Sequence, residues 1–194
     1  MGELAERQAA HWPEAQEISQ RNCQRARMPY EAFNAAMAKI RKPGQLKHER
    51  LAQLIDLATR FSDAIAPQAA CREGCSHCCY IAVPISRSEA QLVARASGRK
   101  ITEPLDPIPF GGKRVLPLGY DHPCPFLKDS RCSIYSARPM TCRTCLNMDD
   151  TPLLCELDPD SVSTVPYADA TPIWLLGGQI LGRETWADIR DWFR

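Results

Sequence analysis

Four cysteines stand within nine residues of this chain, in the pattern Cys71-x3-Cys75-x2-Cys78-Cys79. A chain gathers thiols at this density for disulfides, for a metal or for redox chemistry. The spacing favours a metal, because two cysteines separated by two residues can turn both sulfurs toward one ion across a tight turn. The same spacing recurs in the C-R-T-C stretch at residues 142–145.

Length, charge and the lack of apolar runs narrow the class of protein to which this chain can belong. The chain has 194 residues, enough to bury a core without disulfide staples. Its formal net charge is +1 with both signs interspersed, so we expect no nucleic-acid partner and no acidic membrane partner. The N-terminus lacks the apolar stretch of a signal peptide, and no run approaches a membrane span. We therefore expect a cytoplasmic protein, in which cysteines serve as metal ligands before they form disulfides. A protein partner is not indicated.

Composition changes near residue 67, because only three of the sixteen prolines and one of the ten cysteines precede it. This change predicts three segments within one domain. Residues 1–66 are a helical N-terminal segment, residues 67–150 are the cysteine-cluster metal-binding region, and residues 151–194 are a loop plus a C-terminal helix.

Apolar stripes with helical spacing predict two helices in the first segment. Phe33, Met37 and Ile40 form one stripe, which stops at Pro43-Gly44, and a stronger stripe runs over residues 51–65. The more polar residues 14–27 are also predicted to be helical.

Turn and cap signals shape the rest of the chain. Ser86-x-x-Glu89 is a capping box and Gly98 a stop signal, which predicts a helix between them. Residues 80–85 read as extended, residues 126–135 as a hairpin and residues 146–170 as irregular loop, while Pro139 begins a helical turn. A last helix is predicted to start at Thr185, with its aromatic residues in the core. The predicted fold class is mainly α with a small irregular and β-hairpin cysteine-rich region, in a single metal-stabilised domain.

An ordered series of short motifs follows the first cysteine cluster: P-C-P-F-L at 123–127, C-S-I-Y at 132–135 and R-P-M-T-C-R at 138–143. Together with the first cluster, over residues 71–145, this series resembles the YkgJ-like cysteine-cluster family of the CxxCxxCC type, described as a zinc- or iron-chelating domain. The resemblance implies metal chelation and no particular reaction. The spacing from Cys71 to Cys75 is one residue longer than the family pattern.

The candidate metal ligands are the cysteines of the region 71–145: Cys71, Cys75, Cys78, Cys79, Cys124, Cys132, Cys142 and Cys145. Cys78 and Cys79 are adjacent, so their side chains point about 100° apart in a helix and do not both suit one mononuclear site. A closed zinc site or one iron–sulfur cluster takes about four thiolates. Eight thiols therefore suggest two sites, or one site with spare thiols. Cys23 and Cys155 stand outside the series and are interpreted as packing thiols.

Other side chains beside these cysteines are candidates for supporting roles. Arg138 and Arg143 flank a predicted ligand, and we expect them to donate charge-assisted hydrogen bonds to sulfur. His77 and His122 are alternative nitrogen ligands, although cysteine is plentiful here.

The sequence thus predicts a metal-binding protein whose metal orders residues 71–145. Zinc is the first choice, because a reduced all-thiolate set suits it. Iron, bound as an iron–sulfur cluster, is the second choice. Two alternatives stay open: an iron–sulfur enzyme resembling flagellin lysine N-methylase, which carries a similar cysteine cluster, and a metal chaperone or store. No catalytic or cofactor-binding residue is assigned.

Overall fold

The computed structural model describes residues 2–26, 29–72, 74–117 and 119–194. It is mainly helical, with two small antiparallel sheets, which confirms the predicted fold class. The helices are α1 (Glu3–Arg25), α2 (Tyr30–Arg41), α3 (Lys47–Ile65), α4 (Arg87–Ser97), α5 (Met140–Thr144), α6 (Thr171–Leu181) and α7 (Ile189–Trp192). The 3₁₀ turns are η1 (Ala66–Gln68), η2 (His77–Cys79), η3 (Tyr135–Ala137) and η4 (Leu153–Cys155). The strands are β1 (Pro84–Ser86), β2 (Leu127–Lys128), β3 (Arg131–Cys132) and β4 (Trp186–Asp188).

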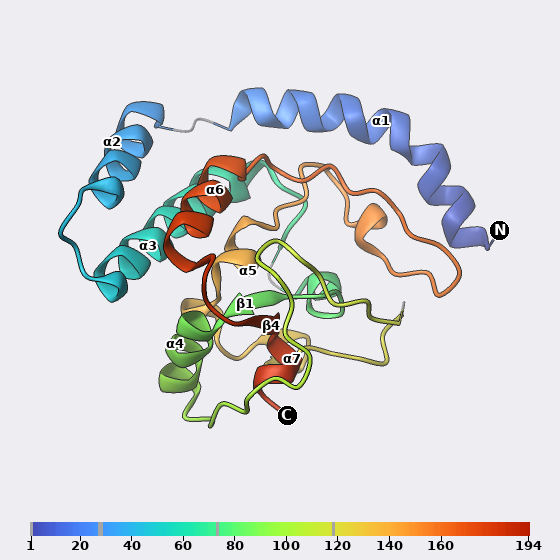
Figure 1. Ribbon diagram of the computed structural model, residues 1–194. Helices are drawn as coiled ribbons and strands as arrows, with labels where there is room; N and C mark the ends of the chain where they lie inside the picture. The colour runs from blue at the N-terminus through green and yellow to red at the C-terminus, as the bar shows by residue number, and fades with distance from the viewer. Residues whose placement is uncertain (1, 27–28, 73, 118) are drawn as a thin grey trace.

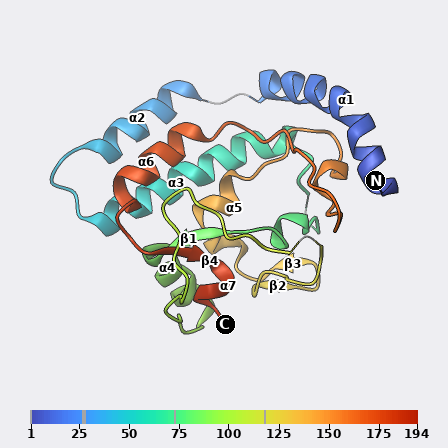
Figure 2. The same ribbon diagram turned by 45° about the vertical axis from the view of Figure 1, so that its right-hand side comes forward.

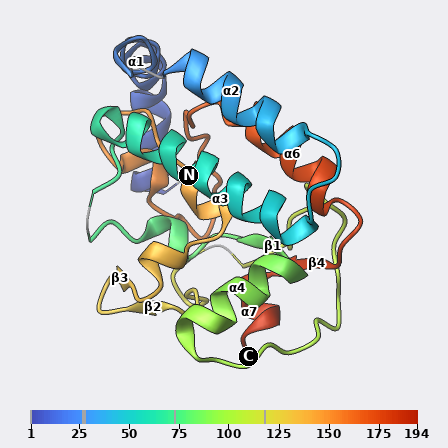
Figure 3. The same cartoon turned by 90° about the vertical axis from the view of Figure 1, so that its left-hand side faces the viewer.

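The elements form two layers with α5 between them (Figures 1 and 3). Helices α2, α3 and α6 make one layer, and β1, β4, α4 and α7 make the other. Helix α5 touches α3 on one side and β1 on the other. Because α5 carries part of the second cysteine pair, this arrangement places thiols where the two layers meet.

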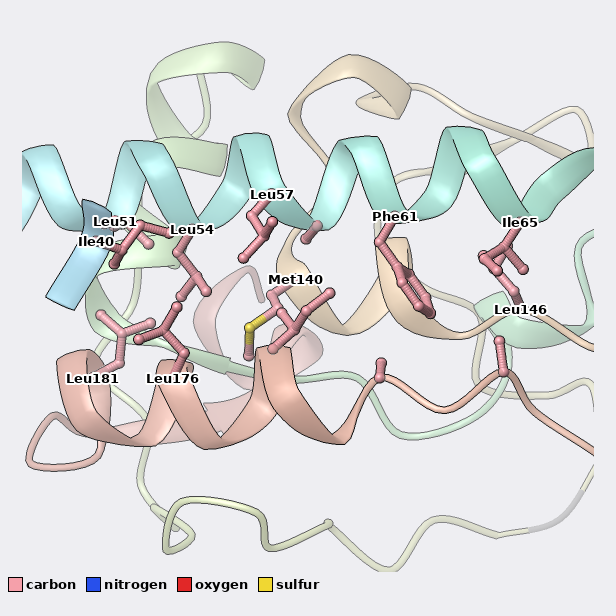
Figure 4. Close-up of a cluster of buried hydrophobic side chains, with 14 of the residues drawn as sticks. Ile40, Leu51, Leu54, Leu57, Phe61, Ile65, Met140, Leu146, Leu176 and Leu181 are labelled. Carbon is pink, nitrogen blue, oxygen red and sulfur yellow. The ribbon is translucent and has the colours of Figure 1, made fainter. Parts of the chain in front are cut away.

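Helix α3 is the centre of the first hydrophobic cluster, and its apolar stripe is the predicted one. Leu54, Leu57 and Phe61 are buried on the face that meets α5 and α6 (Figure 4). Gly177 of α6 permits this packing, because a Cβ there would lie only 3.0 Å from the Met140 side chain. The cluster is built from aliphatic side chains at helical spacing, so its stability comes from apolar burial.

The second hydrophobic cluster lies around β1, β4, α4 and α7. Helix α4 has the predicted limits: Ser86 accepts a hydrogen bond from the Glu89 amide, and Gly98 ends the helix with φ of 70°. The hairpin β2–β3, visible in Figure 2, turns at Asp129 and Ser130, which both have positive φ. Irregular chain follows α5 as expected, with η4 and isolated bridges as its ordered parts within the described residues.

Three boundaries differ from the expectations. Helix α1 starts at Glu3 rather than near residue 14, because buried polar side chains on it bind carbonyls of the loop after α5. It ends at Arg25, and Arg27, the last residue of the predicted range, lies outside the described residues. The extended stretch is also shorter than predicted, since β1 covers only Pro84–Ser86.

The prediction of a helix starting at Thr185 is wrong. Residues Trp186–Asp188 form β4, which pairs antiparallel with β1 in the register Ile85↔Ala187. Helix α7 begins only afterwards, with Asp188 as its N-cap. The hydrogen-bonding edge of β1 provides a partner that the local sequence does not reveal. The C-terminal aromatic residues are nevertheless buried in the core, as predicted.

Candidate metal centre

All the cysteines predicted as ligands line one cavity of about 550 Å³. They are Cys71, Cys75, Cys78, Cys79, Cys124, Cys132, Cys142 and Cys145. They come from the segment before η2 and η2 itself, from the approach to the hairpin, from β3 and from α5 with its C-cap. The chain thus brings thiols from distant parts of the sequence to one place. All ten cysteines of the chain are described, and all are free thiols.

Short backbone contacts position these thiols. The Cys124 amide donates to the Cys79 carbonyl at 2.7 Å, which joins the first cluster to the hairpin approach. The Met140 amide donates at 2.9 Å to the buried Glu89 carboxylate, which also accepts from the backbone amide of Ser86. The start of α5 is therefore tied to the start of α4, and this fixes the turn that presents Cys142.

Cys78 is exposed, and the pKa of its thiol is lowered by its neighbours. Residues His77–Cys79 form the turn η2, in which the Cys79 thiol donates a hydrogen bond to Cys78. This hydrogen bond, with help from the positive charge of Arg138, lowers the pKa of Cys78 to about 7. A thiolate is the form that binds metal, so Cys78 is prepared for ligation near neutral pH.

Burial has the opposite effect on three other thiols that line the cavity. It raises the pKa of Cys124 to about 11 and that of Cys145 to about 12, and it also raises the pKa of Cys142. These groups are neutral thiols at pH 7 in the absence of metal. Since a metal binds the deprotonated form, its binding must release protons from them.

The two arginines expected beside the ligands have different roles. The charge of Arg138 lowers the pKa of Cys78 and opposes the raised pKa values of Cys132 and Cys142, and its side chain lines the cavity. Arg143 instead donates to the carbonyls of Arg138 and Ser136, at 2.7 and 2.6 Å, and to the Thr59 hydroxyl at 3.0 Å. Arg143 is thus a brace between α5, η3 and α3, and its recorded hydrogen bonds go to oxygen rather than sulfur.

The histidines near the cluster are not among the residues that line the cavity. His77 Nδ1 lies 2.8 Å from the Tyr120 hydroxyl. The His122 carbonyl accepts a hydrogen bond from Arg190 Nε at 2.9 Å. Their contacts tie loops together.

Arg190 of α7 is a clamp that the sequence gave no reason to expect. Its guanidinium donates to the carbonyls of Cys79, Ile81 and His122 at 2.9 to 3.1 Å, and it pairs with the fully buried Asp188. Asp188 in turn accepts from the Val83 amide at 2.7 Å. The C-terminal helix therefore holds both segments that lead to Cys79 and Cys124.

We expect Arg190→Ala to destabilise the protein by about 3 kcal/mol, because it leaves Asp188 buried without its cation. Thermal unfolding of the metal-loaded protein, followed by circular dichroism, measures this loss. Arg95→Ala, at an exposed position of α4, is the matched control and should leave the midpoint unchanged. Equal midpoints of thermal unfolding for the two variants would show that the contacts of Arg190 contribute nothing to stability.

The cysteines set aside in the sequence differ from each other. Cys23 is exposed on α1, away from the cavity lining. Cys155 lies at the end of η4, and its electrostatic neighbours are Cys71, Cys145 and Cys75. Its sequence position, ten residues after Cys145 and outside any motif, gave no signal of this proximity.

The donor set of the cavity fits a thiophilic metal. Eight thiols line it, one of them has a depressed pKa, and a cation lies beside them to offset thiolate charge. Among the residues of the described ranges, no three acidic, histidine or cysteine side chains already stand at the spacing of a single ion. The thiols surround a cavity rather than a point.

Comparison with known proteins agrees with this donor set. The family model CxxCxxCC, described as "Putative zinc- or iron-chelating domain", matches residues 70–167, half of the chain. No curated protein and no solved structure gives a significant match. Over the described part of the chain, none of the helices combines the length and apolar character that crossing a membrane requires. With its motif series matched and its thiols gathered in one cavity, the chain belongs to the CxxCxxCC family of zinc- or iron-chelating domains.

Proposed function

We propose that this protein binds zinc in the thiol cavity and that the bound metal orders residues 71–145. The observation that carries the proposal is the convergence of eight cysteines, from separate segments, on one cavity of about 550 Å³. Such a cavity is far larger than one ion with a sulfur shell of about 2.3 Å radius. The proposal therefore includes more than one metal atom.

Thiolate ligation would stabilise the cysteine-bearing segments, whose secondary-structure elements are short. Within the described residues, the cysteine-bearing stretch consists of short turns, strands of two or three residues and the five-residue helix α5, with α4 as its longest element. Elements this short contribute few backbone hydrogen bonds, whereas ligand bonds to a structural metal contribute free energy directly to folding. When zinc is bound, it would join the first cluster, the hairpin and α5 through sulfur.

Charge and compartment are consistent with this proposal. Four thiols that bind one Zn²⁺ release four protons and leave a net charge of about −2. Arg138, which lines the cavity, would offset part of that charge. Thiols in this number stay reduced in the cytoplasm, where we place the protein.

An iron–sulfur centre is the second candidate, because Cys78 and Cys79 both line the same cavity. Adjacent thiols suit a cluster in which several irons share the ligands better than they suit one tetrahedral ion. This candidate would favour an enzyme similar to flagellin lysine N-methylase.

Elemental analysis with an absorption spectrum, on protein prepared without oxygen, separates the two candidates. We expect zinc at more than one equivalent and no visible absorption, because Zn²⁺ is d¹⁰. A brown preparation with stoichiometric iron and acid-labile sulfide would overturn the zinc proposal in favour of the iron–sulfur centre. The same protein prepared in air is the control, since it shows whether exposure to oxygen changes the occupant.

A further inference from the structure

We propose that Cys155 is a ninth metal-binding thiol, and that it forms a site with Cys71, Cys75 and Cys145. We define these four as thiol group A. The remaining cavity thiols except Cys78 are thiol group B: Cys79, Cys124, Cys132 and Cys142. The inference rests on the proposed function, because it assumes that the cysteines bind metal.

A single buried residue holds two thiols of group A. The Asn147 side chain donates from Nδ2 to Cys155 Sγ at 3.4 Å, and its backbone amide donates to the Cys71 sulfur. The Asn147 carbonyl accepts from the Ala70 amide at 2.8 Å, next to Cys71 in the chain. Asn147 is only 1% exposed, so Cys71 and Cys155 are bound to the same rigid point of the fold.

Tyr167 brings the third thiol into this group. It pairs with Asn147 across an isolated antiparallel bridge, and its side chain is hydrogen-bonded to Cys145. Cys145 and Cys155 both lie within electrostatic range of the Tyr167 hydroxyl. Asn147 and Tyr167 therefore form a bridge with Cys71, Cys145 and Cys155 around it. Cys75 is held beside Cys71 by a turn in which the Cys75 amide donates to the Arg72 carbonyl at 3.0 Å.

Helix α1 fixes the position of Cys155 from the outside. Gln8, which is 3% exposed, donates from Nε2 to the Leu153 carbonyl at 2.9 Å and to the Glu156 carbonyl at 2.8 Å. These carbonyls flank Cys155 in the chain. Figure 1 shows α1 beside the loop that carries η4. The buried polar residues of α1 thus keep this turn against the thiol region.

The thiols of group B pack on the other side of the cavity. All of them contact the second hydrophobic cluster, around β1, β4, α4 and α7, whereas Cys71 packs against the first cluster, around α3. Cys79 lies within electrostatic range of Cys124 and Cys142, and Cys124 lies within electrostatic range of Cys132. Cys78 interacts with members of both groups, and Cys142 of group B also interacts with Cys145 of group A, so Cys78, Cys142 and Cys145 lie where the two groups meet.

Two groups of four match the ligand number of a closed structural zinc site. Without Cys155, group A has three thiols and an open position. With it, the nine thiols divide into four, four and the exposed Cys78 between them. The division accounts for a cavity that is too large for one ion.

Metal content of the full-length chain tests the assignment. We expect Cys155→Ser to lose about half of the wild-type metal, Cys132→Ser to lose the other half, and the double variant to lose nearly all, because each removes one ligand of a separate four-thiolate site. Cys23→Ser, at an exposed position, is the matched control and should keep the full content. A Cys155→Ser protein with the content of Cys23→Ser would overturn the inference alone. Wild-type protein without bound metal would overturn the proposed function as well.

A thiol-protection experiment on the wild-type protein covers the case in which Cys155→Ser fails to fold. Metal-loaded protein is treated with increasing chelator, then with iodoacetamide, and each cysteine is followed by mass spectrometry. We expect Cys155 to become modified in step with Cys71 and Cys145, and at a different chelator concentration from Cys124 and Cys132. Modification of Cys155 without chelator, or of both groups in a single step, would overturn the two-site division.

Discussion

Removal of the metal by a strong chelator is expected to loosen residues 67–145 first, while the helices over residues 30–66 keep their order in part. Binding of a structural zinc contributes on the order of 10 kcal/mol to the free energy of folding. Helix α3 keeps its apolar contacts with α6 without any ligand, because Leu54, Leu176 and Leu181 are fully buried there. Around the thiols, the described chain consists of short turns and strands that ligand bonds would have to hold.

Hydrogen–deuterium exchange with mass spectrometry measures this loss segment by segment. Peptides from residues 67–145 should exchange faster in the chelated protein, and peptides from α3 should change least. The metal content must be measured on the same sample. Unchanged exchange over 67–145 in protein proven to be free of metal would contradict a structural role for the metal.

Serine substitution at Cys75, Cys124, Cys132 or Cys142 is expected to lower the metal content to about half or less, since each removes a thiolate from the cavity. Elemental analysis of each purified variant gives the content. The far-ultraviolet circular dichroism spectrum shows whether the helices persist. Serine cannot replace the sulfur, because a hydroxyl is a poor ligand for a thiophilic metal.

Cys23→Ser separates ligation from general damage in this series. Cys23 is exposed on α1 and does not line the cavity, so its variant should keep the wild-type content. An equal loss from Cys23→Ser and from the cavity variants would mean that the thiols act through folding rather than through ligation, and the ligand assignment would fail.

Local chemistry made part of the fold predictable. Helix α4 was predicted with its limits because Ser86, Glu89 and Gly98 act on backbone groups within a few residues. The stripe of α3 was predicted because its apolar spacing matches one face of a helix. The hairpin turn at Asp129 and Ser130 follows the same logic, since its polar residues accept positive φ.

Other elements depend on partners that are distant in the sequence. Strand β4 exists because β1 offers its edge to Trp186–Asp188, more than a hundred residues away in the chain. The full length of α1 depends on Gln8 and Asn22, which bind carbonyls of the loop after α5. Neither residue carries a pattern that predicts such contacts, so a reading of α1 alone could not extend it to Glu3.

The metal site also has features that the sequence predicts and features that only the tertiary structure decides. The sequence identified the metal-binding chemistry and the CxxCxxCC family through its residue types, its Cys-x-x-Cys spacing and its motif series. These features are local, so they can be recognised without knowledge of the fold. Which thiols share a site depends on how β1, α5, η4 and α1 pack. Only the tertiary structure placed Cys155 against the Asn147 side chain, and only it placed Arg190 on the Cys79 carbonyl. These contacts join residues far apart in sequence, and their positions are set by burial and hydrogen bonding across the whole fold.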